Sequence, residues 1–191
     1  MDTLFIPFSQ GEQNAQLISM AARWQAAYRN QAWATQCENR VYSPGSPVLD
    51  GLNCADTLYI LAHGQGTDLI INNPGLTGYV LDASALAMRL LDAHLPSRHR
   101  NIVLSICNTN GSLDAFATEF RDEMLRLHYL AVQVHYFGAS VSIPTLLDAA
   151  TGEVGQTVLF LRPGAHFIST PSGLAPTGVP LKAEHYKYQV Q

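Results

Sequence analysis

Charge is scarce in this sequence, and long hydrophobic runs are missing. Charged residues make up only 14% of the 191 residues, the formal net charge is −4, and no run of lysine and arginine is present. Nucleic-acid binding needs a basic stripe that neutralises phosphates, so we expect no nucleic-acid partner. No stretch approaches the roughly eighteen apolar residues that cross a bilayer, so we expect no membrane span.

Cysteine is scarce as well. The three cysteines, Cys37, Cys54 and Cys107, form neither a zinc spacing nor a redox motif, and any disulfide scheme leaves one of them unpaired. Reduced thiols are the simplest interpretation, and no metal site is predicted. The first residues show no basic segment followed by an apolar one. The expected location is the cytoplasm, or outside the cell through an export route whose signal is not readable here.

Hydrophobic residues, in contrast, make up 47% of the chain. A chain of this length and composition buries about two thirds of the surface that it exposes when unfolded, so one core suffices. The sequence therefore predicts a single domain over residues 1–191. Repeated prolines and glycines from about residue 163 predict a loop-rich end rather than a second domain.

Two short apolar runs each end in a reactive side chain. Residues 57–64 read TLYILAHG and residues 101–108 read NIVLSICN. Each run has the length and the turn-residue flanks of a strand that is covered on both faces. Between them, residues 82–95 repeat leucine at helical spacing behind a capping Asp82 or Ser84. The sequence thus predicts a strand, a crossover helix and a second strand parallel to the first.

The predicted unit brings a histidine and a cysteine to one edge of a sheet. Ligands of parallel sheets lie beyond the carboxyl ends of the strands, and His63 and Cys107 stand at those ends. A free cysteine has a pKa of about 8.5 and is only a few per cent thiolate at neutral pH. An imidazole beside it supplies the base that a useful nucleophile needs.

The order of these motifs resembles the cysteine peptidases of the caspase, gingipain, clostripain, legumain and separase clan. His63-Gly64 matches the clan's His-Gly, and Cys107 matches its nucleophile at a strand end. Residues 104–109, LSICNT, are similar to the LSACNT run of bacterial caspase-like domains. Ile106 replaces the usual alanine and is bulky enough to narrow a substrate groove. The resemblance covers less than half of the chain.

The resemblance implies a fold and a reaction. The fold is an α/β three-layer αβα sandwich with a mostly parallel central sheet, of the caspase–hemoglobinase type. The reaction is peptide-bond hydrolysis by a cysteine endopeptidase, in which Cys107 attacks the carbonyl and His63 protonates the leaving amine. The backbone amides of Gly64 and Cys107 match the clan's oxyanion hole, in which loss of one donor costs about 3 kcal/mol. No metal or cofactor is implied, and the partner is a protein or peptide substrate.

Further residues are candidates for substrate binding. Ser105 lies two residues before Cys107 and therefore on the same side of its strand, where a hydrogen-bonded core hydroxyl is the alternative. Asn108 directly follows the nucleophile. Asp68 lies in the glycine-bounded segment 65–80, which predicts a small hairpin that walls one side of the cleft. An acidic residue in a cleft loop, such as Asp68 or Asp148, would select a basic side chain, whereas Arg40 or Arg162 there would select an acidic one.

Two other functions remain open. One is a binding or adaptor module that keeps the caspase-like fold without turnover, although both dyad positions are intact. The other is an α/β-hydrolase with a cysteine nucleophile, which would need glycines around the nucleophile and a later histidine, His135 or His166. Within the protease hypothesis, the compact size resembles the protease modules of bacterial toxins, and a bacterial effector or defence protease is expected.

The rest of the chain predicts the elements around this unit. Apolar residues at helical spacing predict helices, and apolar runs bounded by turns predict short strands. The helices are expected at 11–30 and 113–130, and the strands at 3–8, 40–42, 131–138, 156–161 and 166–169. Pro7 cannot donate to a neighbouring strand, so it is expected toward the end of the first strand or at an edge.

Overall fold

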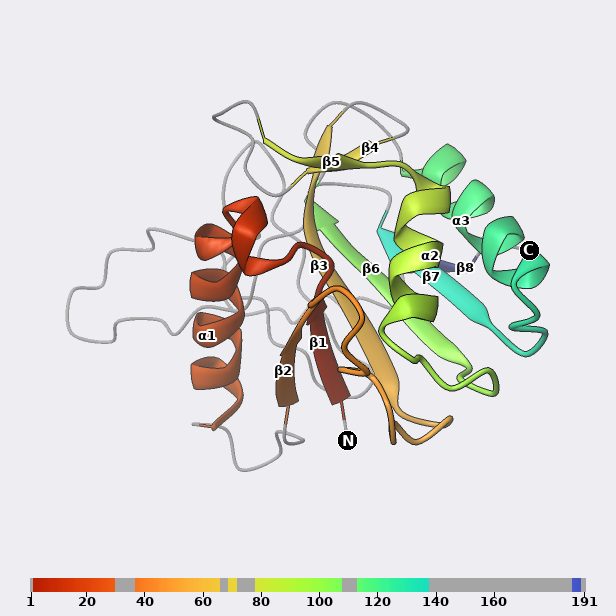
Figure 1. Cartoon of the computed structure of the whole chain (residues 1–191), viewed down its shortest axis with the longest axis horizontal. Coiled ribbons are helices and arrows are strands. Elements are labelled where there is room, and N and C mark those ends of the chain that lie inside the picture. The colour runs from red at the N-terminus through yellow and green to blue at the C-terminus, as the bar shows by residue number, and fades with distance from the viewer. Residues whose placement is uncertain are drawn as a thin grey trace, which may run out of the picture.

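A mostly parallel β-sheet forms the centre of the molecule (Figure 1). The structure is a computed structural model, and it describes residues 2–29, 37–65, 69–71, 78–107, 113–137 and 187–189. The strands are β1 (Asp2–Ile6), β2 (Cys37–Val41), β3 (Thr57–Gln65), β4 (Leu69–Ile71), β5 (Val80–Leu81), β6 (Asn101–Cys107), β7 (Gln133–Phe137) and β8 (Lys187–Gln189). The helices are the 3-10 turn η1 (Gln10–Glu12) and the α-helices α1 (Ala15–Arg29), α2 (Ala83–Asp92) and α3 (Asp114–Arg126).

The sheet has the strand order β2-β1-β3-β6-β7-β8. The first five of these strands run parallel, whereas β8 runs antiparallel to β7. β4 and β5 extend β3 as an antiparallel pair. The central strands β3 and β6 are apolar almost throughout, as strands covered on both faces must be.

Helices cover both faces of the sheet. Trp24 of α1 packs against Tyr59 of β3 with ring centroids 5.5 Å apart, so α1 covers the face that carries Tyr59. Tyr136 of β7 lies level with Ile60 and therefore on the opposite face, where its hydroxyl donates to Asp114 at the start of α3 at 2.6 Å. α2 packs beside α3 in the same layer (Figure 1). The predicted α/β class, the three layers and the mostly parallel sheet are confirmed.

The predicted crossover unit is confirmed with its cap. Asp82, rather than Ser84, begins α2, and its carboxylate accepts a hydrogen bond from the amide of Ala85 at 2.7 Å. The apolar face of α2 is fully buried at Leu86 and Leu90. Burial of a leucine side chain contributes about 1.5–3 kcal/mol, so this face anchors α2 on the sheet.

Near the N-terminus the predicted bounds are too long. Strand β1 ends at Ile6 instead of residue 8, because Pro7 has no amide proton to donate to a neighbouring strand. The helix predicted from residue 11 begins at Ala15. Before it, η1 ends at Glu12, and the next residue, Gln13, has a φ of +56° that interrupts helical geometry.

The later elements are also shorter at their ends than predicted. α3 ends at Arg126 because His128 takes a left-handed conformation with φ +66°, and the amide of Tyr129 then bonds the carbonyl of Met124. β7 consequently starts at Gln133 rather than at residue 131. The strands predicted at 156–161 and 166–169, and the loop-rich part from about 163, lie outside the described residues. Among the described helices, none has the length and apolar character to cross a membrane.

Candidate active site

His63 lies near the carboxyl end of β3, between two neighbouring strands. On one side it is level with Cys107, the last residue of β6, and on the other it is level with Ile71 of β4. If β1 continued in its register, Phe8 would lie beside His63, because Phe5 is level with Ile60. The chain leaves the sheet at Pro7 instead, and β4 takes that place.

The register between β3 and β6 is unbroken from Thr57, level with Asn101, to His63, level with Cys107. Adjacent strands lie about 4.8 Å apart, so the backbones of the two residues are direct neighbours. Both residues stand at the carboxyl edge of a parallel sheet, where ligands of this architecture bind. The sequence predicted the shared edge, and the structure adds the one-to-one pairing.

The ring of His63 is half-buried, and its Nε2 is buried without a hydrogen bond in the part of the chain that the structure describes. Burial lowers the pKa of His63 below the ordinary value of 6.5. The imidazole is therefore neutral at neutral pH. A neutral ring offers a lone pair that accepts a proton, which is the protonation state of a general base.

Of the other predicted site residues, the structure describes Gly64 and Ser105. Gly64 follows His63 and is level with Ile70 of β4. Ser105 is level with Leu61 and only 5% exposed, and this burial favours the core hydroxyl over a groove residue. Asn108 and Asp68 lie outside the described residues.

The predicted hairpin is confirmed, and it lies beside His63. β4 pairs antiparallel with residues 63–65 of β3, and β5 pairs antiparallel with β4. The two turns of this meander fall outside the described residues. The hairpin thus borders His63 on the side that faces away from Cys107.

His135, one of the two histidines that an α/β-hydrolase could use, does not reach this edge. His135 of β7 is level with Val103 of β6, and Val103 in turn is level with Tyr59. It therefore lies four residues below His63 along the strands, about 13 Å at the rise of a strand. His166, the second histidine considered, lies outside the described residues.

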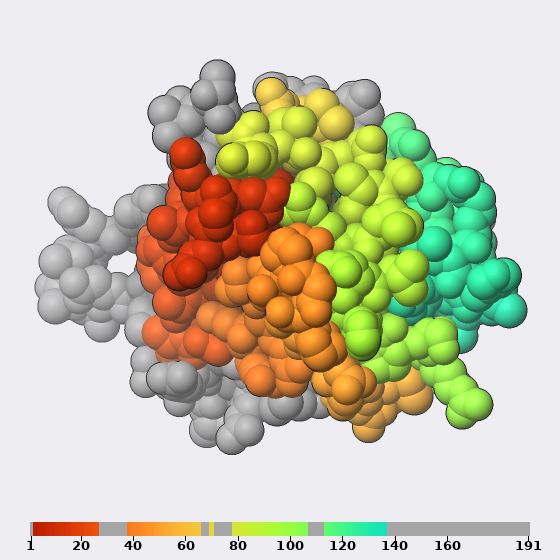
Figure 2. Space-filling model, in the orientation of Figure 1, coloured from red at the N-terminus to blue at the C-terminus, as the bar shows by residue number. Residues whose placement is uncertain are grey.

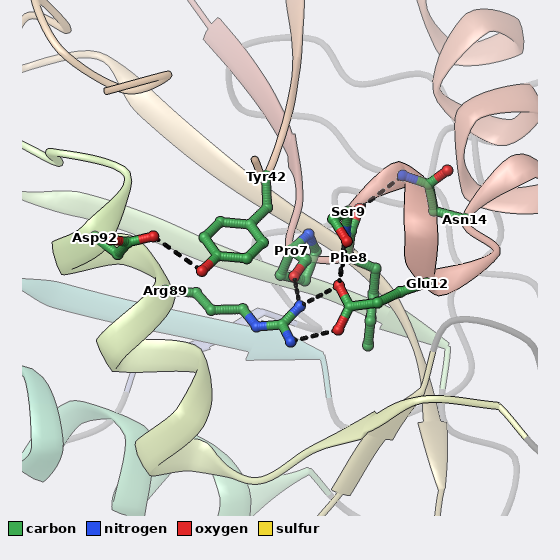
Figure 3. A network of polar contacts seen from close by, with 8 residues as sticks. All are labelled: Pro7, Phe8, Ser9, Glu12, Asn14, Tyr42, Arg89 and Asp92. Atoms are coloured by element: carbon green, nitrogen blue, oxygen red, sulfur yellow. Dashed lines mark hydrogen bonds and ion pairs between the residues drawn. The ribbon is translucent and has the colours of Figure 1, made fainter. Parts of the chain in front are cut away.

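A polar network that sequence reasoning missed lies next to the end of β1 (Figure 3). The guanidinium of Arg89, in α2, binds the carboxylate of Glu12 through both terminal nitrogens, at 2.6 and 2.8 Å, and donates to the carbonyl of Pro7. It also lies over the ring of Tyr42, 4.7 Å from the centroid, and over the ring of Phe8 at 5.7 Å. Arg89 and Glu12 lie 77 positions apart in the sequence, so no local pattern could predict that they pair.

Two carboxylates extend the network around Arg89, those of Glu12 and Asp92. Glu12 accepts hydrogen bonds from the amide and the hydroxyl of Ser9, at 2.7 and 2.9 Å. Burial alone would raise the pKa of Glu12, but the hydrogen bonds from Arg89 and Ser9 hold it below its ordinary value. The hydroxyl of Tyr42 donates to Asp92 at 2.9 Å, and the amide of Gly45 donates to the same oxygen at 3.0 Å. These two bonds lower the pKa of Asp92.

A pocket of about 430 Å³ opens beside this network. Its walls are residues 9–11, Ile18 of α1 and residues 41–44. Figure 2 shows the N-terminal segment (red) meeting the residues that follow β2 (orange) and α2 (yellow-green) on one face of the molecule. The described residues contain no group of three or more histidine, cysteine or acidic side chains that could hold a metal ion.

The sequence matches no protein-family model and no curated protein. Among solved structures, the chain is similar to a secreted C11 cysteine protease from Bacteroides thetaiotaomicron, in complex with an irreversible peptide inhibitor. The TM-score is 0.41 at 11% identity, over 75% of this chain and 49% of that chain. The chain thus spans about half the length of this neighbour.

Proposed function

We propose that this protein is a cysteine peptidase in which Cys107 is the nucleophile and His63 its base. The observation that carries the proposal is the register of β3 and β6, in which His63 and Cys107 are level at the carboxyl ends of adjacent parallel strands. In a parallel sheet, level residues share a face. Nucleophilic catalysis needs an imidazole and a thiol close together, and the neighbouring backbones of His63 and Cys107 support that proximity.

The electrostatics of His63 support the role of base. Its burial lowers its pKa, so at neutral pH the ring accepts the thiol proton rather than already holding one. The sulfur then attacks the carbonyl carbon, and the imidazolium returns the proton to the leaving amine. Water hydrolyses the resulting thioester, with His63 again as base. The amides of Gly64 and Cys107 would bind the oxyanion.

The proposed substrate is a protein or peptide. Asn108 follows the nucleophile in sequence, and Asp68 belongs to the segment between β3 and β4, so both remain proposed substrate contacts. Ser105 remains one as well, although its burial favours a structural role. We propose no cofactor, because acyl transfer through a thiolate needs none.

Selective alkylation tests the dyad without knowledge of the substrate. The native protein is treated with substoichiometric iodoacetamide at pH 7, and peptide mapping follows labelling at each cysteine. We expect Cys107 to react at least tenfold faster than Cys54, which is half-buried and serves as the internal control. The His63→Ala substitution should slow labelling of Cys107 at least tenfold and leave Cys54 unchanged.

Equal labelling rates at Cys107 and Cys54 would contradict the proposed dyad. So would a labelling rate at Cys107 that His63→Ala does not change. The adaptor module without turnover would then be the better hypothesis. Fast labelling at Cys107 justifies a second step, cleavage of a random decapeptide library followed by mass spectrometry. We expect cleavage by the wild type and none by Cys107→Ala.

A further inference from the structure

The pocket beside the Arg89 network lies at the same edge of the sheet as His63. Residues 9–11 follow β1 and residues 42–44 follow β2, and both strands run parallel to β3 and β6. In the strand order, β2 is three strands away from β6. Three strand spacings amount to about 14 Å, which an extended peptide covers with four or five residues as it passes the β4–β5 hairpin beside His63.

Side chains outside the pocket hold its walls in place. Ser9 is fixed by two hydrogen bonds to Glu12, whose carboxylate is in turn clamped by Arg89. Tyr42 is fixed by its hydrogen bond to Asp92 and by the guanidinium over its ring (Figure 3). A pocket whose walls are held before binding loses little entropy when a ligand enters.

The chemistry of the lining is uncharged and partly apolar. No lining residue carries a charge. The carboxylates bonded to wall residues are engaged elsewhere as well, because Glu12 pairs with Arg89 and Asp92 accepts from the amide of Gly45. Ile18 is 38% exposed, and with the neighbouring Val41 and Pro44 it gives the pocket an apolar side. Its volume falls within the roughly 300–1,000 Å³ typical of ligand pockets.

We infer that this pocket is a substrate subsite that takes an aliphatic or aromatic side chain, four or five residues away from the scissile bond of an extended peptide. This inference rests on the proposed peptidase function and adds a specificity to it. A charged side chain would be rejected, because the walls offer no partner for its charge and entry would strip its water.

Two substitutions disturb the pocket without disturbing the core. Ile18→Asp introduces a charge at an exposed position of the apolar wall. Gly11→Phe adds bulk at another wall, where a Cβ meets no atom within 4 Å, and Gly11→Ala is its conservative control. Met88→Asp is the matched control for the charge, because Met88 is 51% exposed on α2 and does not line the pocket.

The experiment compares decapeptides that share a cleaved bond and carry leucine, phenylalanine or aspartate four or five residues from it. We expect the wild type to cleave the apolar versions about 10-fold faster in kcat/KM at one of these positions. Ile18→Asp and Gly11→Phe should remove this preference while leaving a short substrate, truncated before that position, within twofold of the wild-type rate. Met88→Asp and Gly11→Ala should keep the preference.

Absence of a preference at these positions, or a preference that survives both pocket variants, would overturn the subsite. A wild type that cleaves no peptide contradicts the proposed function instead. In that case the leucine decapeptide is titrated into ¹⁵N-labelled protein. Chemical-shift changes confined to residues 9–11 and 42–44, and lost in Ile18→Asp, support the pocket as a peptide site, and their absence overturns it.

Discussion

Two polar regions at the same edge of the sheet are built in opposite ways. In the Arg89 network, both charges of the central ion pair are bonded to each other and to further groups of the chain. At His63, a buried ring nitrogen has no hydrogen-bond partner among the described residues. Satisfied groups stabilise a fold, whereas an unsatisfied one costs about 1–3 kcal/mol and calls for a functional reason. The comparison separates a region whose charged groups are bonded to one another from one in which a buried ring nitrogen has no hydrogen-bond partner among the described residues.

The largest effect is expected on peptidase activity, when His63 is replaced. His63→Gln removes the proposed base, and we expect peptidase kcat/KM to fall by about 10²–10⁴-fold, the usual contribution of a general base. The free energy of unfolding should not fall, because no hydrogen bond of Nε2 is lost. Activity assays and urea denaturation at pH 7.5 check the two halves. A large loss of stability would show that His63 is a structural residue.

The next largest effect is expected on stability, when the ion pair of the Arg89 network is broken. Arg89→Met leaves the Glu12 carboxylate, whose side chain is 15% exposed, without its cation, and we expect a loss of about 3 kcal/mol in the free energy of unfolding. Arg126→Met is the control, because the exposed Arg126 pairs with Glu123 three positions before it on α3, and such surface pairs contribute about 0.5 kcal/mol. Equal effects of the two substitutions would mean that the network does not hold the fold. Glu12→Gln added to Arg89→Met should recover part of the loss.

Lowering the pH should affect the stability contributions of His63 and of the Arg89 network in different pH ranges. Burial lowers the pKa of both His63 and the fully buried His99 below 6.5, so the unfolded chain takes up protons first as the pH falls. Stability is therefore complete above about pH 6.5 and decreases below it, by up to about 1.4 kcal/mol per pH unit for each proton. The pKa of Glu12 is lowered as well, and its contribution is lost only below about its ordinary value of 4.5.

Urea denaturation at pH 7.5, 6.5, 5.5 and 4.5 measures how the free energy of unfolding changes with pH. We expect His63→Gln and His99→Gln each to flatten this dependence between pH 6.5 and 5.5, whereas Glu12→Gln should leave that interval unchanged. A slope that neither histidine variant alters would contradict the assignment. The acid range thus tests the two regions independently of any substrate.

The smallest effect tests the edge of the network. Tyr42→Phe keeps the ring under the Arg89 guanidinium and removes only the hydroxyl that donates to the half-buried Asp92. We expect a smaller drop in Tm than for Arg89→Met, and a pocket preference that weakens without disappearing. Thermal unfolding and the decapeptide pair provide the two readouts. A drop as large as that of Arg89→Met would move the centre of the network from the ion pair to Tyr42.

Local patterns in the sequence were sufficient for the central unit. The apolar runs at 57–62 and 101–106 form strands because their residues suit burial on both faces, and Asp82 begins a helix because its carboxylate caps a free amide. The strand ends that carry His63 and Cys107 follow from the same runs. These features depend on residues that are close together in the chain, which is why the sequence alone determined them.

Tertiary structure alone decided the rest. The level pairing of His63 with Cys107 depends on how two strands slide against each other, and the place of β4 beside His63 depends on where β1 leaves the sheet. The Arg89–Glu12 pair and the pocket beside it join segments that are distant in sequence. Such contacts form only when the whole sheet brings its loops together at one edge, so no local spacing can encode them.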